Sequence, residues 1–439
     1  MHACLTRACA GVLCALMLAA CGGGETVVAV DAVEPNQGPL GGGQTITVRG
    51  EGFLAGGAAP NYALLGGALT LQVSALSDSE LQLVTPPGSE PGEVDLVIFN
   101  SNGYAVAAGA YAYVGPPEIT ALDPPSGHYK GGTEVTITGS GFQELDAGQA
   151  AVTFDGVPAR NIRVVSDSEI LVTTPPGTPY RHVTVALANA RGQAALDRGY
   201  EYTQASGLLA LTGRRGYSDP RRGLYYVDTE TGEAIFLFEV DVRELEVQGL
   251  ATAEDGTVYG VSSENNLLYQ IDLQRQSFEE IGPLAALGGP GVVYSITDLE
   301  FHDGILYGLD RNQGLFGALS TESGLFSPLG EPNSLFGCCD SRSLMSDGTS
   351  LYFLRSGNLY VVDPETGALS EPFGAVRTGL FSGAAFVDGA FYLSERIGGI
   401  VLGGGGPEHA RIWRVSLDGL AAGLVATVPS GIHGLAVAP

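Results

Sequence analysis

The sequence predicts an all-β protein in which two β-sandwich domains are followed by a five-bladed β-propeller. Residues 33–113 align without a gap to residues 122–202 at a constant offset of 89 positions. A second, different repeat fills the chain from residue 207 onward, and no sustained 3.6-residue apolar period follows the first 20 residues. The 65 glycines and 24 prolines are spread widely, which suits short strands joined by many turns.

The chain begins with an export signal. Arg7 precedes an uncharged run over residues 8–20, which is too short to cross a bilayer as a helix. The run ends in Leu-Ala-Ala-Cys, which resembles the bacterial lipobox, in which the thiol of the cysteine takes a diacylglycerol. The resemblance implies a signal peptide over residues 1–20, lipidation of Cys21, a tether over residues 21–29 and a membrane contact through acyl chains.

The expected location is therefore the cell envelope, at the surface or the periplasmic face. In lipoproteins a residue other than Asp after the cysteine generally permits transfer to an outer membrane, and here that residue is Gly22. An ordinary cleaved secretory signal is the alternative.

The two copies of the first repeat define domains over residues 30–115 and 116–204. In the first copy, alternation places Ile46 and Val48 on one face of a strand, and Val94, Leu96 and Ile98 on one face of another. In the second copy the same positions are Val135, Ile137, Val183, Val185 and Leu187. Turn residues every 8 to 12 positions favour a small antiparallel sandwich.

Both copies carry a family resemblance. Each has a Pro-x-x-Gly opening, a Gly-Gly-x-x-(Ile/Val)-Thr-(Val/Ile)-x-Gly-x-Gly-Phe segment, a Thr-Pro-Pro-Gly and a closing Tyr-x-Tyr. This pattern resembles the IPT/TIG family of immunoglobulin-like domains. The resemblance implies the fold more than a function, because the family serves as a spacer in surface receptors and exported bacterial proteins and contacts DNA in some transcription factors.

Residues 205–439 are expected to form the propeller. Five similar strand motifs recur there, and between them run strands that follow Asp-Gly turns: residues 223–228, 267–272, 314–319, 358–363 and 411–416 carry the motif, and the turns lie at 255–256, 303–304, 347–348 and 388–389. We expect Leu208–Leu211 to pair with the C-terminal strand at Leu435, which closes the ring and removes an exposed edge. Six blades is the alternative, if a weak copy lies near residues 283–297. The array resembles the broad NHL and quinoprotein-like propellers.

The net charge argues against one class of partner, and the cysteine content allows one disulfide. The formal net charge is −27, and Lys130 is the one lysine of the chain, so nucleic-acid binding is not expected. Cys338 and Cys339 are the cysteines that remain after the signal and the lipidation site. In an oxidising compartment they are candidates for a disulfide between neighbouring residues; two reduced thiols are the alternative. We expect a monomer.

The sequence carries no recognisable catalytic or metal-binding signature, and we expect no cofactor and no metal. The histidines lack the spacing of metal ligands, and no P-loop or nucleophile elbow occurs. One polar group stands out. The residues just before the innermost strand of each blade are all polar and, with the neighbouring acid, form the candidate ligand-binding set: Gln248, Thr297, Asp298, Arg342, Ser382 and His433. The plain alternative is that channel mouths are wet and therefore polar.

The leading hypothesis is a non-catalytic, membrane-anchored display protein whose propeller binds a glycan, peptide or protein partner. A hydrolase or lyase acting on polysaccharide, with Asp298, Arg342 and His433 in the channel, is the second hypothesis. A periplasmic scaffold for envelope assembly is the third.

Overall fold

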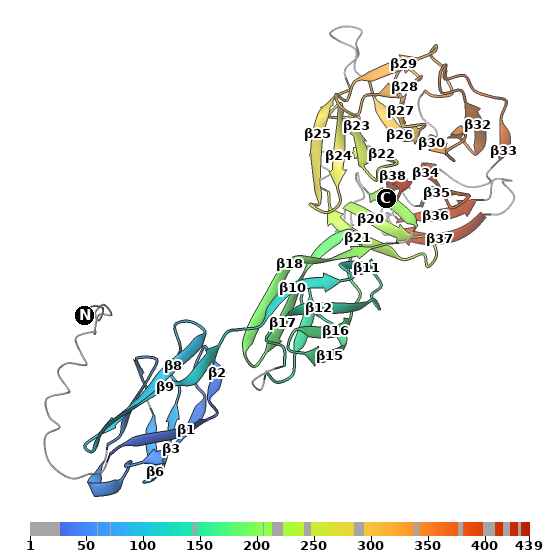
Figure 1. The fold of residues 1–439 in the computed structure, drawn as a ribbon. Coiled ribbons are helices and arrows are strands. Elements are labelled where there is room, and N and C mark those ends of the chain that lie inside the picture. The colour runs from blue at the N-terminus through green and yellow to red at the C-terminus, as the bar shows by residue number, and fades with distance from the viewer. Residues whose placement is uncertain are drawn as a thin grey trace, which may run out of the picture. The chain divides into compact units, whose positions relative to one another are not determined.

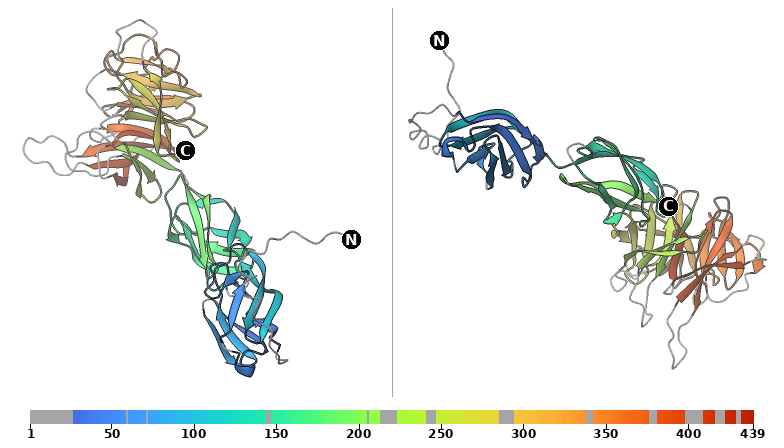
Figure 2. Two further views of the ribbon diagram at one scale, coloured as in Figure 1. Left: turned by 90° about the vertical axis from the view of Figure 1, so that its left-hand side faces the viewer. Right: turned by 90° about the horizontal axis from the view of Figure 1, so that it is seen from below.

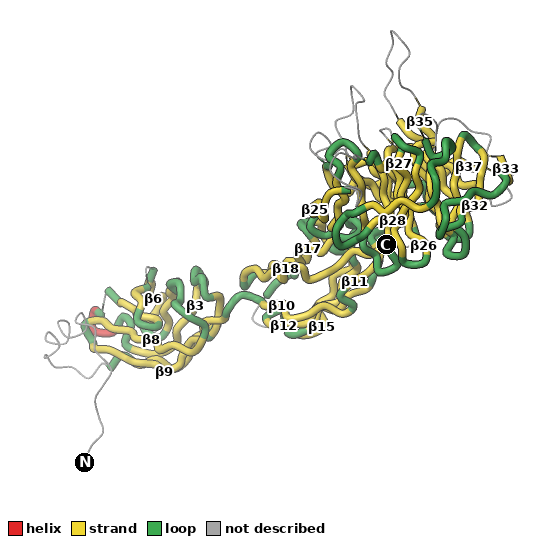
Figure 3. The backbone as a smooth tube through the Cα atoms, turned by 90° about the horizontal axis from the view of Figure 1, so that it is seen from above, coloured by secondary structure: helices red, strands yellow, loops and turns green. Residues whose placement is uncertain are grey.

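The computed structural model describes residues 27–58, 60–70, 72–143, 147–204, 206–212, 223–240, 247–284, 294–337, 342–375, 381–397, 409–415, 422–428 and 432–439. The chain is built from strands, and in the described part its helical structure is one short 3₁₀ turn, Ala55–Gly57, drawn in red in Figure 3. Within these residues no helix has the length and apolar character that a bilayer crossing requires. The predicted all-β class is confirmed.

The chain divides into two compact units. The first holds residues 1–126, 130–176 and 183–201, and the second holds residues 127–129, 177–182 and 202–439. Figure 1 labels many of the strands in each unit, and Figure 2 shows the same ribbon from two further directions.

The first repeat folds as two facing sheets. A four-stranded sheet has the order β1-β3-β7-β6 and a five-stranded sheet the order β2-β9-β8-β4-β5. The strands are β1 (Ala29–Glu34), β2 (Gln37–Pro39), β3 (Thr45–Glu51), β4 (Tyr62–Leu65), β5 (Ala68–Leu69), β6 (Val73–Ser77), β7 (Glu80–Val84), β8 (Gly92–Asn100) and β9 (Gly103–Val114). One pairing departs from the predicted antiparallel sandwich: β2 pairs with β9 in parallel, because the chain switches sheets directly after β1.

The second repeat has the same topology, with sheets ordered β10-β12-β16-β15 and β11-β18-β17-β13-β14. Its strands are β10 (Glu118–Asp123), β11 (Ser126–His128), β12 (Glu134–Ser140), β13 (Ala151–Phe154), β14 (Val157–Pro158), β15 (Arg160–Ser166), β16 (Glu169–Thr173), β17 (Arg181–Asn189) and β18 (Gly192–Thr203). The bulge between Val30 and Ala32 in β1 recurs between Ile119 and Ala121 in β10, at the offset of 89 positions that the sequence shows.

The predicted core faces are confirmed, and they explain the repeated motifs. Ile46, Val48, Leu96 and Ile98 are fully buried, whereas Val94 lies at the margin of the core. The glycine of Thr-Pro-Pro-Gly is required by packing, since a Cβ on Gly88 would lie 2.8 Å from the ring of Tyr113. Gly177 and Tyr202 repeat that contact in the second domain.

The described residues from Gly207 onward form five four-stranded sheets, here called the C-terminal sheets. Their orders are β21-β20-β19-β38, β22-β23-β24-β25, β26-β27-β28-β29, β30-β31-β32-β33 and β34-β35-β36-β37. The strands are β19 (Gly207–Thr212), β20 (Gly223–Asp228), β21 (Ala234–Glu239), β22 (Val247–Thr252), β23 (Val258–Ser262), β24 (Leu267–Asp272), β25 (Ser277–Pro283), β26 (Ile296–His302), β27 (Ile305–Asp310), β28 (Leu315–Leu319), β29 (Phe326–Leu329), β30 (Arg342–Ser346), β31 (Leu351–Arg355), β32 (Asn358–Val362), β33 (Phe373–Ala375), β34 (Phe381–Val387), β35 (Ala390–Ile397), β36 (His409–Val415), β37 (Ala422–Val428) and β38 (Ile432–Val437).

One edge strand from each C-terminal sheet contacts its counterparts in the neighbouring sheets. These inner strands are β22, β26, β30, β34 and β38, and their contacts run in a cycle, from β22 through β26, β30, β34 and β38 back to β22. β38 also pairs antiparallel with β19, so that Leu208 lies opposite Val437 and Ala210 opposite Leu435. The last strand of the chain therefore belongs to the sheet that β19 begins.

The Asp-Gly turns take two forms. Asp303-Gly304 and Asp388-Gly389 are two-residue turns in which both residues have positive φ, the geometry that matches the twist of a hairpin. At Asp255 and Asp347 the loop is longer, and the aspartate oxygen Oδ1 instead accepts a backbone N–H from the residue two positions later. The same dipeptide thus closes all four hairpins by two different mechanisms.

Candidate functional site

The predicted ligand-binding residues all lie at the starts of the inner strands, and most of them lie at β-bulges. Val247 pairs with Ser262 and Gly249 with Val261, which leaves Gln248 as an extra residue in β22. Ser382 in β34 and His433 in β38 occupy the same position in their strands. A bulge interrupts the ladder and redirects the side chain, and bulges are frequent next to binding sites. Their recurrence at this position is the strongest geometric feature of the candidate site.

The third sheet has the widest irregularity. Ile296 pairs with Asp310 and Leu299 with Gly308, so that Thr297 and Asp298 together face one residue of β27. Arg342 is the exception among the predicted residues, since it stands in regular register opposite Arg355. Gln248 is half-buried. The side chains of Ser382 and His433 fall outside the described part of the structure.

Arg342 is held by three acceptors. Its Nη1 donates to the carbonyl oxygens of Phe336 at 2.8 Å and Gly337 at 3.0 Å, and its Nη2 donates to Thr297 Oγ1 at 2.7 Å. The structure therefore brings Thr297 and Arg342 together, as a contact between two inner strands. The guanidinium fixes the loop before β30, and burial lowers its pKa against the opposing effect of Asp298.

At the position of Asp298, the other inner strands have small residues, which are Gly249, Ser343, Gly383 and Gly434. A Cβ on Gly249 would lie 3.0 Å from Asp298 Cα, and one on Gly434 would lie 2.9 Å from the oxygen of Gln248. Glycine therefore allows neighbouring inner strands to approach closely. In β26 the larger side chain makes a bond across the same gap, because Asp298 Oδ2 accepts the backbone N–H of Leu344.

The ionisation of Asp298 is strongly perturbed. Burial raises the pKa of its carboxyl to about 7, although the Leu344 N–H, the Ser343 hydroxyl and the charge of Arg342 oppose that shift. The side chain retains some exposed area, yet the surrounding protein is dense enough that desolvation remains the dominant cause. Near neutral pH this carboxyl is divided between its acid and its carboxylate forms.

Glu300 and His302 extend the polar row along β26. Burial, together with the negative charge of Asp298, raises the pKa of Glu300 well above its ordinary value. His302 is buried, and its Nδ1 lies 2.9 Å from Ser346 Oγ on β30. Alternation places Glu300 and His302 on one face of β26, and Asp298 lies at the irregularity just before them. Sequence reasoning missed Glu300 and His302, although their two-residue spacing from Asp298 was the available signal.

We call this set the β26–β30 seam: Thr297, Asp298, Glu300, His302, Arg342 and Ser346. It is a row of polar and ionisable groups at the inner edge of an otherwise apolar contact between two sheets. Most of the hydrogen bonds described above join one inner strand to the next. The seam therefore has a structural role in holding β26 against β30.

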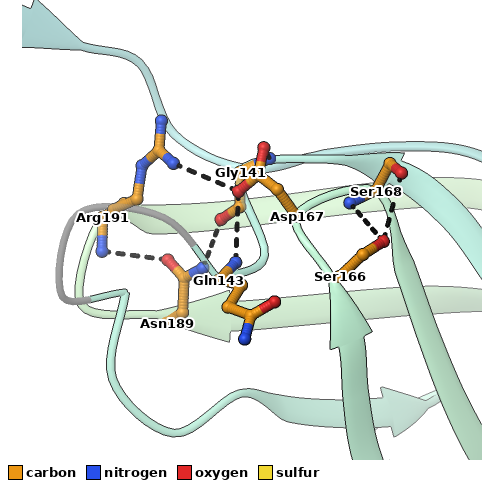
Figure 4. Close-up of polar contacts among 7 residues, drawn as sticks. All are labelled: Gly141, Gln143, Ser166, Asp167, Ser168, Asn189 and Arg191. Carbon is orange, nitrogen blue, oxygen red and sulfur yellow. Dashed lines mark hydrogen bonds and ion pairs between the residues drawn. The ribbon is translucent and has the colours of Figure 1, made fainter.

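A second polar network lies in the second repeat and is also structural. Asp167 accepts the backbone N–H groups of Gly141 and Gln143 and lies 3.8 Å from Arg191 Nη1, while Asn189 Nδ2 donates to the oxygen of Gly141 (Figure 4). The first repeat has the same arrangement, in which Asp78 accepts from Leu54 and Ala55 and Asn100 donates to Gly52. These contacts tie loops together at one end of each sandwich.

Cys21, Cys338 and Cys339 lie outside the described residues, as do residues 285–293 of the segment 283–297, on which the alternative of a sixth blade depends. Across the part of the chain that is described, no three His, Cys, Asp or Glu side chains come close enough to hold a metal ion.

Comparison with known proteins identifies the repeats. Residues 29–113 and 117–202 each match the IPT/TIG domain family, so the chain contains two IPT/TIG domains, which are immunoglobulin-like sandwiches. Plexin A3 of Danio rerio is 27% identical over 184 residues, which cover 41% of this chain and 9% of plexin A3. Fibrocystin-L of Mus musculus is 28% identical over 255 residues, or 56% of this chain and 6% of fibrocystin-L. The chain thus spans less than a tenth of either relative.

Solved structures are more distant. A structural genomics protein of unknown function from Bacteroides thetaiotaomicron VPI-5482 aligns with 84% of this chain and 95% of its own, at 14% identity and a TM-score of 0.31. A score at that level carries no argument about fold or function.

Proposed function

We propose that this chain is an exported, lipid-anchored and non-catalytic binding protein, in which two IPT/TIG domains present a five-bladed β-propeller to a glycan, peptide or protein partner. The observation that carries the proposal is the pair of IPT/TIG domains. Tandem sandwiches with their own cores serve as spacers, and a spacer is useful to a protein that must hold a binding domain away from its anchor.

The propeller is supported by the strand contacts. Five four-stranded sheets whose inner strands contact one another in a cycle are what a five-bladed ring requires. The pairing of β38 with β19 supplies the closure, since it joins strands from the two ends of the C-terminal half in one sheet. Closure of this kind leaves no inner strand without neighbours and protects the sheet edges.

The hydrogen bonds of the seam residues support a non-catalytic role. Arg342 and Asp298, the groups best suited to acid–base or electrostatic catalysis, are engaged by Thr297, two carbonyl oxygens and the Leu344 N–H. The bulge residues Gln248, Ser382 and His433 are the better candidates for contact with a ligand, because a bulge removes its residue from the regular ladder.

Two experiments on cells test the location. Protease added to intact cells removes the C-terminal sheets if the protein is displayed on the surface, and leaves them intact if it is a periplasmic scaffold. Cys21→Ala is expected to abolish acylation and to release the protein into the soluble fraction. A Cys21→Ala protein that stays in the membrane fraction would overturn the lipid anchor.

The binding face is tested with an array of glycans and purified proteins. A Gln248→Ala/Ser382→Ala variant is expected to lose capture, whereas Asp388→Asn, at an exposed hairpin turn, is expected to retain it. Equal capture by both variants would remove the proposed face.

A polysaccharide-acting hydrolase or lyase is the second candidate, and one observation favours it. Two neighbouring carboxyls with raised pKa, Asp298 and Glu300, are a pattern that enzymes use for proton transfer. Turnover of a polysaccharide that disappears in both Asp298→Asn and Glu300→Gln would favour this candidate over the binding protein. Turnover that survives both substitutions would exclude these carboxyls.

A further inference from the structure

The outer face of the five-stranded sheet in the first IPT/TIG domain carries a continuous apolar surface. Strand register aligns two rows across β4, β8 and β9: Tyr62 lies opposite Phe99, which lies opposite Tyr104, and Leu64 lies opposite Val97, which lies opposite Val106. Leu69 on β5 extends the second row beside Leu64. We call these seven residues the β4–β8–β9 face (β8 and β9 are labelled in Figure 1).

Four of these seven side chains are exposed, and Leu64, Val97 and Phe99 between them are half-buried. Tyr104 is 58% exposed, Val106 55%, Leu69 53% and Tyr62 47%, while the alternate residues Ala63, Leu65, Leu96 and Ile98 are fully buried on the other side of the sheet. The rows are therefore the outward side of a regular sheet and not a loosely packed core. At 150–250 Å² for a fully exposed aromatic side chain, the rows offer roughly 400–600 Å², at the upper end of the apolar patches on monomeric proteins.

The second IPT/TIG domain lacks this surface although its backbone is the same. At the positions offset by 89, the seven residues are Ala151, Thr153, Pro158, Ala186, Ala188, Gln193 and Ala195. The fold thus has no need of large apolar side chains on this face. The two copies in one chain differ at all seven positions. We therefore expect the apolar face of the first domain to bind a partner.

The ring geometry disfavours a stacked sugar as that occupant. Tyr62 and Phe99 stack on each other, with ring centroids 5.3 Å apart and planes 16° apart. Their faces are directed largely at each other, so the pair presents less of the flat ring surface that a sugar would use. Edges and grooves of this kind suit interdigitation with the side chains of another protein sheet.

We infer that the β4–β8–β9 face is a dimer interface that binds the same face of a second copy of this chain. The face is self-complementary, since a two-fold axis lying between the rows and perpendicular to the strands places each aromatic row on the partner's aliphatic row. Sheet-on-sheet packing at about 10 Å would bury both. The chain has this face once, so the contact is isologous and closes at two copies.

Electrostatics permit this pairing. The domain is acidic, with Arg49 as its only basic residue, and Glu93 and Asp95 follow the two rows along β8 on the outer face. At 3.3–3.4 Å per residue, the two-fold axis keeps the acidic ends of the two copies about 20 Å apart, which is beyond the Debye length of about 8 Å at physiological ionic strength. The dimer is therefore expected to persist or strengthen as salt is added, whereas docking of a basic protein would weaken.

The interface is small. Two such faces bury about 1,000 Å² in total, at the low end of specific protein interfaces. We expect reversible dimerisation that depends on concentration, in contrast to the monomer expected from the sequence. The inference does not depend on export, on the lipid anchor or on what the C-terminal sheets bind.

Sedimentation velocity of the full chain over a wide concentration range tests the inference. The variant Tyr62→Ala/Phe99→Ala/Tyr104→Gln carries the residues of the second domain and is expected to dimerise at least about tenfold more weakly, a loss of about 1.4 kcal/mol. Circular dichroism establishes that the variant is folded. The matched control is a triple substitution of small outward residues in the second domain to alanine or serine, Thr153→Ala/Ala186→Ser/Ala195→Ser, which is expected to leave dimerisation unchanged.

The reverse graft gives a gain of function. Ala151→Tyr/Ala188→Phe/Gln193→Tyr places an aromatic row on the second domain, and two interfaces in one chain are expected to produce assemblies larger than a dimer. A chain that stays monomeric at all concentrations, or a first-domain variant that dimerises like the unmodified chain, overturns the inference. A dimer that dissociates as salt is added overturns the stated geometry and implicates charged contacts.

Discussion

Replacing Asp298 by asparagine isolates the energetic effect of an ionisable group in the β26–β30 seam. The amide keeps the size of the side chain and an oxygen that can accept the Leu344 N–H, but it cannot ionise. Any difference in pH dependence between the two proteins is therefore due mainly to the carboxyl.

The raised pKa of Asp298 determines the direction in which the free energy of unfolding changes with pH. Between the ordinary value of 3.8 and the folded value of about 7, the folded protein keeps a proton on Asp298 that the unfolded chain has released. The folded state binds more protons in this window, so the free energy of unfolding falls as pH rises through it. At about 1.36 kcal/mol per pKa unit the full loss is about 4 kcal/mol, present above pH 7 and absent below pH 4. Coupling to Glu300 and Arg342 reduces the part that Asp298→Asn removes.

Urea unfolding followed by tryptophan fluorescence measures this effect in the correct part of the molecule. Trp413 is the one tryptophan of the chain and lies on β36, so its signal reports on the C-terminal sheets and not on the IPT/TIG domains. The asparagine variant is expected to gain stability relative to the unmodified protein as pH is raised from 4 to 8, by about 2–4 kcal/mol.

Asp388→Asn is the control, because it removes an exposed carboxyl from a hairpin turn in another of the C-terminal sheets, and its stability should run parallel to that of the unmodified protein. Adding Glu300→Gln to Asp298→Asn should flatten the pH profile further, since burial also raises the pKa of Glu300. If the profiles of Asp298→Asn and the unmodified protein are parallel between pH 4 and 8, the carboxyl is not desolvated and the reasoning fails.

Three further predictions concern single contacts and are checked by the same unfolding experiments or by calorimetry. Arg342→Met leaves two carbonyl oxygens and a hydroxyl without their donor, and is expected to cost about 2–4 kcal/mol at pH 8 in the tryptophan-detected transition; a cost below 0.5 kcal/mol would show that water replaces the guanidinium. Gly249→Ala forces a Cβ against the backbone of Asp298 and should cost about 1–3 kcal/mol, whereas Gly423→Ala, with nothing within 4 Å, should be nearly neutral; equal costs would contradict the close approach of the inner strands. Asp167→Ala frees two backbone N–H groups in the second IPT/TIG domain and should lower its calorimetric unfolding temperature, at a cost of about 1–2 kcal/mol, and an unchanged temperature would show that the loop network does not stabilise the domain.

The sandwich domains could be predicted closely because their sequence signals are local and occur twice. The alternation that contains Ile46 and Val48 fixes which face of β3 is buried, and the gapless offset requires the second domain to repeat the arrangement. The parallel pairing of β2 with β9 was missed. It depends on a change of sheet after β1, a tertiary event that a three-residue strand does not reveal.

The sequence indicated at which end of the inner strands the polar residues lie, but not the contacts that these residues make. The sequence placed the polar residues just before the inner strands, whereas the structure has them inside the strands, as with Gln248 in β22. The sequence around Gln248 and His433 does not indicate a bulge. A bulge residue is recognised only from how its strand pairs with the neighbouring strand. The bond from Leu344 N–H to Asp298 likewise joins two sheets that are far apart in sequence, and nothing local predicts it.

Because the chain contains repeats, a residue that differs between copies can be compared directly with its counterparts in the same fold. Four inner strands have glycine or serine where β26 has Asp298, and that one exception places a carboxyl with a raised pKa in the seam. Two IPT/TIG domains share a topology, yet only the first has Tyr62, Phe99 and Tyr104 on its outer sheet. In both cases the common residues are those that the fold needs, because the backbone forms with or without the exception. Each exception is energetically unfavourable, because it buries a carboxyl in one case and exposes apolar side chains in the other. These positions are therefore the best places to test for a function beyond folding.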